Sequence, residues 1–299
     1  MGREKERDKE RLDVLLVERG LFDSREKAKA AIMAGLVYAG EERLEKPGMK
    51  VDRSIGLKVK GPPHPYVSRG GLKLEKAIRA FGLDLTDRVM LDIGASTGGF
   101  TDCAIRHGVS FVYAIDVGYN QLDWSLRSHP KVKVMERTNF RYVKPEDLRG
   151  PAPDFAAIDV SFISLRLILP ALRDIFLARN GADGVDGGRP GREDAQRAKG
   201  ECVALIKPQF EAGREQVGKS GVVRDPEVHR AVLERVIGEA GTIGFRLKGL
   251  TSSPITGGEG NIEFLAHWTL DETDPGLVPD GSIPALVERT VREAHAAFS

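Results

Sequence analysis

Apolar runs of strand length recur along the chain beyond residue 70, and segments long enough to form a helix separate most of them. The first five runs are largely apolar, which is typical of parallel strands covered by helices on both faces. Only a short, hairpin-like gap separates the last two, so we expect them to pair antiparallel. The pattern predicts an α/β, Rossmann-like domain with a mostly parallel sheet. The predicted strands are residues 89–95, 111–118, 132–139, 154–162, 201–209, 245–253 and 261–270.

The N-terminal residues show a shorter, helical pattern. Leu12, Leu15 and Leu16 are spaced as one face of a helix. Asp23 or Ser24 can cap a second helix, SREKAKAAIMAG, and two strand-like pieces, LVYAG and IGLKVKG, follow it. These elements predict a small α+β domain ahead of the large one.

The small domain carries an excess of positive charge. Residues 1–80 have a balance of +6 and the remainder −5, within a net charge of +1. Arg25, Lys27 and Lys29 occupy the first turns of the second predicted helix, where cations oppose the helix dipole. We therefore interpret them as placed for an anionic ligand such as nucleic acid, with a solvated basic face as the alternative.

Segments of unusual composition indicate the domain boundaries. Prolines in GPPHPYVSRGG favour an extended linker between the two domains. A segment at 178–200, rich in Gly, Asp and Arg and without a period, is expected to be a flexible surface insertion. The expected parts are a charged tail (1–10), the small domain (11–62), a linker (63–70), the α/β domain (71–272) and a helical C-terminal tail (273–299).

Several protein classes conflict with the composition. No run of about 18 apolar residues is present, which argues against a membrane-spanning helix, and the charged N-terminus does not resemble a secretory signal. The two cysteines, Cys103 and Cys202, lie in apolar stretches, so we expect buried thiols and a cytoplasmic protein. No His/Cys cluster predicts a metal site.

The stretch LDIGASTGGFTD, residues 91–102, admits two interpretations. Ser96 fits the G-x-S-x-G elbow of serine hydrolases. A hydrolase also needs an upstream oxyanion loop, whereas a basic domain precedes this stretch, and only His267 comes late enough on a strand to serve as the base. We therefore favour a ligand-binding loop and keep the hydrolase as the alternative.

The glycine spacing indicates which ligand the loop binds. A P-loop and a dinucleotide fingerprint both fail, because no Gly-Lys-Ser/Thr follows and the glycines are wrongly spaced. Asp116 ends the next strand, where a carboxylate can accept both ribose hydroxyls of an adenosine. A cofactor without phosphates, S-adenosyl-L-methionine, fits better than NAD. The candidate cofactor residues are Asp92, Gly94, Ser96, Thr97, Gly98, Gly99, Phe100, Asp116 and Asn139.

Four charged residues stand at or near the ends of predicted strands, where doubly wound sheets place their sites. They are Lys73, Asp159, Lys207 and Glu263. A charge in an apolar strand is costly unless it is paired or lies in a cleft. The residue types alone leave both a catalytic group and a structural ion-pair cluster open.

Two family resemblances bear on these alternatives. The segment RLDVLLVERGLFDSREKAKAAIMAGLVYAG, with the later KPG, resembles the S4-type RNA-binding domain, or αL motif. This resemblance implies that Arg11, Arg25, Lys27 and Lys29 face RNA phosphates. A generic αβ module with a basic face remains the alternative.

The motifs SRGGLKL, LDIGASTGGFTD, IDVSF, IKPQFE and GNIEF together resemble the TlyA, or hemolysin-A-like, ribosomal RNA methyltransferases, whose catalytic part is FtsJ-like. The resemblance implies a class I S-adenosylmethionine-dependent fold. It also implies 2′-O-methylation of ribosomal RNA, free or in ribosomal subunits, by a Lys-Asp-Lys-Glu tetrad at Lys73, Asp159, Lys207 and Glu263, without a metal.

The implied mechanism assigns a role to each member of this tetrad. Lys207, with a pKa lowered by Lys73 and by burial, would be the base, while Asp159 and Glu263 orient the lysines and the hydroxyl. Three alternatives remain: a cytolysin, as the hemolysin name suggests, a silent RNA-binding protein, and a methyltransferase for another RNA acceptor. The modified nucleotide, the ribosomal subunit and the oligomeric state do not follow from the sequence.

Overall fold

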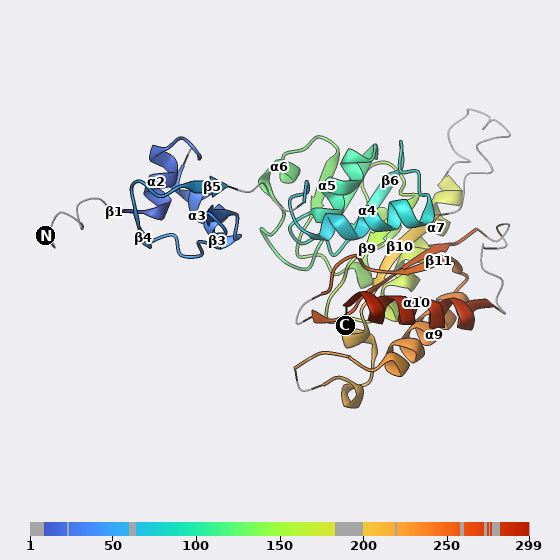
Figure 1. The fold of residues 1–299 in the computed structure, drawn as a ribbon. Coiled ribbons are helices and arrows are strands. Elements are labelled where there is room, and N and C mark those ends of the chain that lie inside the picture. Colours follow the sequence, from blue (N-terminus) through green and yellow to red (C-terminus); the bar gives the residue numbers. More distant parts are fainter. Residues whose placement is uncertain are drawn as a thin grey trace, which may run out of the picture. The chain divides into compact units, whose positions relative to one another are not determined.

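The computed structural model describes residues 9–22, 24–59, 64–182, 200–218, 220–257, 260–271, 274, 276 and 282–298 (Figure 1). The chain divides into two compact units, Met1–Pro65 and Tyr66–Ser299.

The described residues of the first unit form two helices and five short strands around an apolar core. Helices α2 (Leu12–Glu18) and α3 (Arg25–Met33) bury the leucines that the spacing predicted, together with Ile32. The side chain of Ser24 caps α3, since its oxygen accepts from the Lys27 amide at 3.3 Å. The strands are β1 (Lys9–Arg11), β2 (Val37–Ala39), β3 (Glu42–Arg43), β4 (Lys50–Asp52) and β5 (Leu57–Val59).

The strands of this unit pair in two small sheets. β1 pairs antiparallel with β4, and β2 pairs with β3 and β5. Lys9 and Glu10 therefore belong to a strand, although their charge pattern suggested a frayed tail. Pairing with β4 satisfies their backbone groups, which no local pattern of side chains reveals.

The second unit is built on one seven-stranded sheet with the order β11-β12-β10-β9-β6-β7-β8. β12 runs antiparallel to both of its neighbours, and the other neighbouring pairs are parallel. The mostly parallel α/β sheet and the antiparallel last pair are confirmed. The strands are β6 (Val89–Ile93), β7 (Phe111–Ile115), β8 (Val132–Met135), β9 (Phe155–Ile158), β10 (Glu201–Ile206), β11 (Arg246–Ser252) and β12 (Phe264–Thr269).

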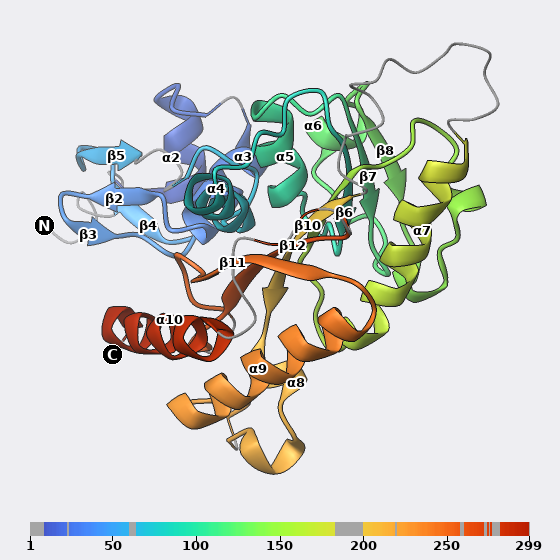
Figure 2. The same ribbon diagram turned by 90° about the vertical axis from the view of Figure 1, so that its right-hand side faces the viewer.

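Helices cover both faces of this sheet (Figure 2). One face packs against α4 (Gly70–Phe81) and α5 (Gly99–Arg106). The other packs against α7 (Leu169–Ala182), α9 (Pro226–Thr242) and α10 (Ile283–Phe298). Burial on both faces explains why the central strands are largely apolar. The short elements are α6 (Trp124–Arg127), α8 (Pro208–Glu211), η1 (Phe140–Tyr142), η2 (Pro145–Asp147), η3 (Leu165–Leu167) and η5 (Arg214–Gln216).

The strands end earlier than the apolar runs suggested. β6, β7, β9 and β10 stop at residues 93, 115, 158 and 206, and the residues after them form loops at the carboxyl edge of the sheet. Helix α7 continues through Ala182, into the predicted insertion, and residues 183–199 lie outside the described part of the chain. No described helix is long and apolar enough to cross a membrane. Both cysteines are buried and free.

Candidate active site

The glycine-rich turn after β6 brings two strand ends into contact. Gly94 adopts a φ of +88°, which favours glycine. A Cβ there would lie 2.4 Å from the carbonyl oxygen of Asp159, so only glycine lets the end of β9 pack this closely. The Asp159 amide donates to the carbonyl oxygen of Ile93 at 2.9 Å, which fixes the approach.

A cavity of about 250 Å³ opens beside this turn. Its walls include Lys73, Asp159 and a segment of the predicted linker, Ser68 to Gly70. Five of the candidate cofactor residues also line it: Gly94, Ser96, Thr97, Gly99 and Phe100. The structure therefore brings more than half of the predicted cofactor residues to one cavity with two of the predicted catalytic side chains.

Asp116 holds the glycine turn from the side of β7. One carboxylate oxygen accepts from the Ser96 amide at 2.8 Å and the other accepts from the Gly118 amide at 2.7 Å. The first contact helps to hold Ser96 at its positive φ of +49°. Asp116 does not line the cavity, and ribose binding by this residue stays a prediction.

Three other candidate cofactor residues also lie outside the cavity wall. A Cβ on Gly98 would meet the Leu126 side chain at 2.3 Å, so this glycine serves packing. Asn139 is exposed and caps η1, because its side-chain oxygen accepts from the Arg141 amide at 3.1 Å.

Asp92, the third, is fully buried at the end of β6. The Thr101 hydroxyl donates to its Oδ2 at 2.5 Å, and its Oδ1 has no hydrogen-bond partner among the described residues. Burial raises the pKa of Asp92 to about 7, against the opposing effect of the Thr101 hydrogen bond.

Lys73, Asp159, Lys207 and Glu263 form one continuous chain of ion pairs. The Lys73 ammonium lies 2.6 Å from Glu263 Oε2 and 3.6 Å from Asp159 Oδ2. The Lys207 ammonium lies 2.6 Å from Asp159 Oδ1. The Lys73 and Lys207 side chains are 8% and 9% exposed, Glu263 is 2% exposed and Asp159 is 19% exposed. We call these residues the tetrad; its two cations and two anions neutralise each other in a mostly buried place.

Local sequence explains how the tetrad is assembled. Pro208, which cannot donate to a sheet, ends β10 and begins α8, so Lys207 stands at the strand end. Glu263 immediately precedes β12, and its carbonyl oxygen accepts from the Ser253 amide at 2.8 Å. A Cβ on Gly257 would lie 2.1 Å from Glu263 Oε1, so this glycine leaves room for the carboxylate.

Sequence reasoning missed the residues that follow Asp159. The Ser161 hydroxyl accepts from the Lys207 ammonium at 3.1 Å. Phe162 is 89% exposed, has a φ of +63°, and lies with its ring centroid 4.8 Å from that of Phe210. The IDVSF motif contains both residues, but a positive φ at phenylalanine leaves no signal in a sequence.

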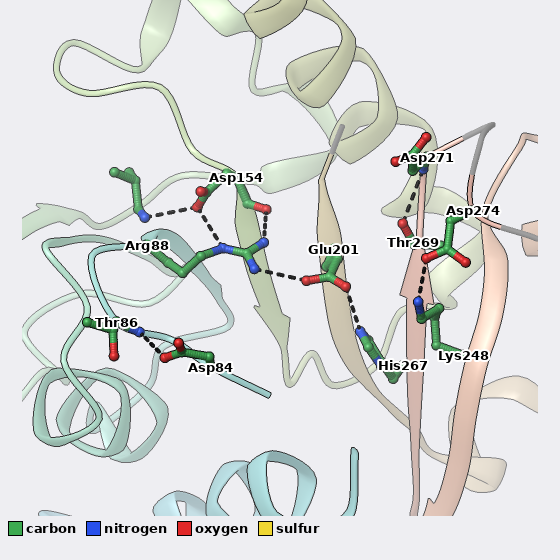
Figure 3. Close-up of polar contacts among 11 residues, drawn as sticks. Asp84, Thr86, Arg88, Asp154, Glu201, Lys248, His267, Thr269, Asp271 and Asp274 are labelled. Carbon is green, nitrogen blue, oxygen red and sulfur yellow. Dashed lines mark hydrogen bonds and ion pairs between the residues drawn. The ribbon is translucent and has the colours of Figure 1, made fainter. Parts of the chain in front are cut away.

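The structure separates Ser96 from the histidine that a hydrolase would need. His267 lies 3.5 Å from Glu201, which also pairs with Arg88, and Arg88 contacts Asp154 (Figure 3). This network joins the amino ends of β6, β9 and β10 to β12, whereas Ser96 follows the carboxyl end of β6. Among the described residues that line the cavity, none is a histidine.

Comparison with known proteins identifies both units. Residues 66–269 match the model of the FtsJ-like methyltransferases, and residues 10–54 match that of the S4 domain. The chain belongs to the FtsJ-like methyltransferase family.

Several relatives match this chain over almost its whole length. The Bacillus subtilis protein YqxC, named as an rRNA methyltransferase, is 55% identical over 96% of this chain and 97% of its own. The 16S/23S rRNA (cytidine-2′-O)-methyltransferase TlyA of Mycobacterium tuberculosis is 39% identical over 95% and 97%. A solved structure from Streptococcus thermophilus that carries a hemolysin name is 50% identical, covers 97% of each chain and has a TM-score of 0.70.

Family membership makes this chain a methyltransferase with S-adenosyl-L-methionine as the methyl donor. The predicted resemblance to the TlyA and hemolysin-A-like proteins is confirmed, as is the S4 domain.

In the S4 domain, two of the predicted RNA-binding residues, Arg11 and Arg25, pair with the same carboxylate. Asp13 is buried, and its two carboxylate oxygens lie 2.9 Å from the guanidinium groups of Arg11 and Arg25. These hydrogen bonds, that of Arg11 foremost, hold the pKa of Asp13 well below its usual range. The side chains of Arg11 and Arg25 are still 45% and 48% exposed. Lys27 is exposed and Lys29 half-buried on α3.

Proposed function

We propose that this methyltransferase transfers a methyl group to a ribose 2′-hydroxyl of ribosomal RNA, with the tetrad as its catalytic group. The observation that carries the proposal is the buried ion-pair chain from Glu263 through Lys73 and Asp159 to Lys207, beside the cavity at the glycine turn. The S4 domain and the name of the M. tuberculosis relative support ribosomal RNA as the substrate.

The residues at the carboxyl edge fit the methyl donor. The cavity of about 250 Å³ is smaller than the range of roughly 300–1,000 Å³ typical of ligand pockets, so it would hold only part of the donor. Gly94, Ser96 and Thr97 would surround the methionine end. The buried, unpartnered Oδ1 of Asp92 suits a nearby amino group, directly or through water. Asp116 would accept the ribose hydroxyls, and the amide nitrogen of Asn139 would face the adenine.

When bound, the donor supplies an electrophilic methyl group on a positively charged sulfur. The ribose oxygen forms a bond to the methyl carbon as the carbon–sulfur bond breaks. For Lys207 to act as the base it would first have to release its own proton, after which its amine would accept the proton of the ribose hydroxyl as the oxygen takes up the methyl group. Asp159, 2.6 Å from that nitrogen, orients Lys207 and stabilises the ammonium that forms. Lys73 and Glu263 hold Asp159 in place. In-line positioning of the hydroxyl would contribute much of the rate.

Phe162 offers a surface for the substrate base next to the tetrad. Its exposed ring, three residues after Asp159, is available to stack on an extruded base. Stacking of this kind contributes about 1–3 kcal/mol per base. Arg11, Arg25, Lys27 and Lys29 would contact phosphates and position the enzyme on the RNA, either free or in a ribosomal subunit in the cytoplasm.

The experiment is a map of 2′-O-methyl groups on ribosomal RNA with and without the purified protein and S-adenosyl-L-methionine. New ribose methyl groups that disappear with Lys207→Ala support the proposal. Methyl incorporation on a base nitrogen, or only into transfer RNA, would overturn it in favour of another RNA acceptor.

A further inference from the structure

Glu211 is a buried carboxylate close to the tetrad that has no part in the proposed chemistry. It is 8% exposed and lies at the end of α8, four residues after Lys207. One of its oxygens accepts from the Ser164 hydroxyl at 2.7 Å and the other accepts from the Leu165 amide at 2.8 Å. Ser164 and Leu165 belong to the loop that begins at Asp159.

Two segments therefore run side by side, with contacts along their length. Residues 159–165 form the first, which we call the Asp159 loop, and residues 207–211 form the second. At one end Lys207 pairs with Asp159 and Ser161, and in the middle the Phe162 and Phe210 rings touch. At the other end Glu211 holds Ser164 and Leu165.

Glu211 provides a fixed point for this arrangement. Its carbonyl oxygen accepts from the Arg235 guanidinium on α9 at 2.5 Å, which ties α8 to a long helix of the core. The Asp159 loop itself carries exposed residues at Ser161 and Phe162, and Phe162 has the strained φ of +63°. A strained, exposed conformation persists only where its flanking residues are held.

We propose that Glu211 is a positioning residue, which fixes the far end of the Asp159 loop and thereby sets Asp159 and Ser161 against Lys207. The inference rests on the proposed function, because it gives Glu211 a task in the reaction through the tetrad. Burial raises the pKa of Glu211, so the protein carries an energetic cost for placing a carboxylate here. The two hydrogen bonds from Ser164 and Leu165 offset part of this cost.

The test compares three variants of the full-length protein. Glu211→Ala removes both contacts to the loop. Glu211→Gln keeps them, since the amide oxygen can accept from the Leu165 amide while its nitrogen donates to the Ser164 hydroxyl. Glu234→Ala removes an exposed glutamate from α9 and is the matched control. For each, single-turnover methyl transfer to ribosomal RNA is measured across pH with saturating donor, together with hydrogen exchange of the Leu165 amide.

We expect Glu211→Ala to lower the single-turnover rate by about tenfold or more, because small misplacement of a reacting group is costly. Its pH–rate profile should shift, since Asp159 is less firmly held against Lys207, and the Leu165 amide should exchange faster. Glu211→Gln should restore the rate and the profile, and Glu234→Ala should match the unaltered protein.

Failure of the proposed function and failure of the positioning role give different results. An unaltered protein that transfers no methyl group to ribosomal RNA would overturn the proposed function, while the exchange of Leu165 still reports the contact. An active protein in which Glu211→Ala only lowers thermal stability, with rate and pH profile unchanged, would overturn the positioning role.

Discussion

The ammonium nitrogen of Lys73 lies 2.6 Å from Oε2 of Glu263, although 190 residues separate the two in the chain. Lys73 comes from α4, before the first strand of the large sheet, and Glu263 immediately precedes the last strand. Their contact joins the beginning and the end of the methyltransferase domain's sequence at the edge of the sheet where the cavity lies. Because Glu263 is buried, its carboxylate depends on the Lys73 ammonium for charge compensation.

Removal of the Lys73 ammonium should therefore destabilise the folded protein. We expect Lys73→Met to lower the free energy of unfolding by about 3–5 kcal/mol, since Glu263 is left buried and unpaired. Urea denaturation of this variant, next to the exposed Lys76→Met on the same helix, measures the difference. Equal free energies of unfolding for the two variants would show that Glu263 does not need Lys73 as a partner.

Loss of the proposed base should abolish transfer and spare donor binding. Lys207 does not line the cavity, so Lys207→Ala should change the affinity for S-adenosyl-L-methionine by no more than about threefold. The single-turnover rate should fall by at least about 100-fold, as expected for loss of a general base. Calorimetry and tritium incorporation give the two quantities, and unchanged turnover would remove Lys207 from the mechanism.

Asp92 should make the stability of the donor-free protein fall as pH rises. Its pKa is raised from 3.8 to about 7 by burial, so the folded protein holds a proton that the unfolded chain has released. The destabilisation is absent below about pH 4, grows towards pH 7 and is then constant, with an upper limit of about 4 kcal/mol. Asp92→Asn should abolish this part of the pH dependence in denaturation experiments. If the free energy of unfolding changes with pH in the same way in both proteins, the prediction is wrong.

The network at the amino edge should support the fold without acting on catalysis. His267, followed by Arg88, lowers the pKa of Glu201 to about 2, so its stabilisation is present above about pH 4.5 and is lost as pH falls through 2. Arg88→Met should lower the free energy of unfolding by about 2–3 kcal/mol near pH 7. Turnover per folded molecule should stay the same, and a slower enzyme would connect this edge to the active site.

The two lysines of α3 should act on RNA affinity through charge alone. Lys27→Ala and Lys29→Ala are each expected to reduce the slope of log affinity against log salt by about 1, if each cation neutralises one phosphate. Asp13→Asn should instead destabilise the S4 domain, because Arg11 and Arg25 lose a buried anion. Filter binding over a range of salt concentrations tests the lysines, and an unaltered slope would place them away from the RNA.

The order of secondary structure and a set of candidate site residues could be predicted from the sequence alone. Strands buried on both faces are largely apolar, so the sequence predicted β6, β7, β9 and β10 from their apolar runs. The glycine turn, Asp116 and the tetrad were visible because their residue types are costly or conformationally special at strand ends. Family resemblance, carried by short motifs, supplied their expected roles.

Only the tertiary structure decided which of these residues meet. The strand order, the separation of Ser96 from His267 and the contact of Lys73 with Glu263 depend on pairing between distant segments, and no local pattern encodes that pairing. The sequence likewise did not predict the positive φ of Phe162, the partners of Asp13 or the hydrogen bond from the Leu165 amide to Glu211. Each depends on burial and hydrogen bonding between elements that come together only when the chain folds.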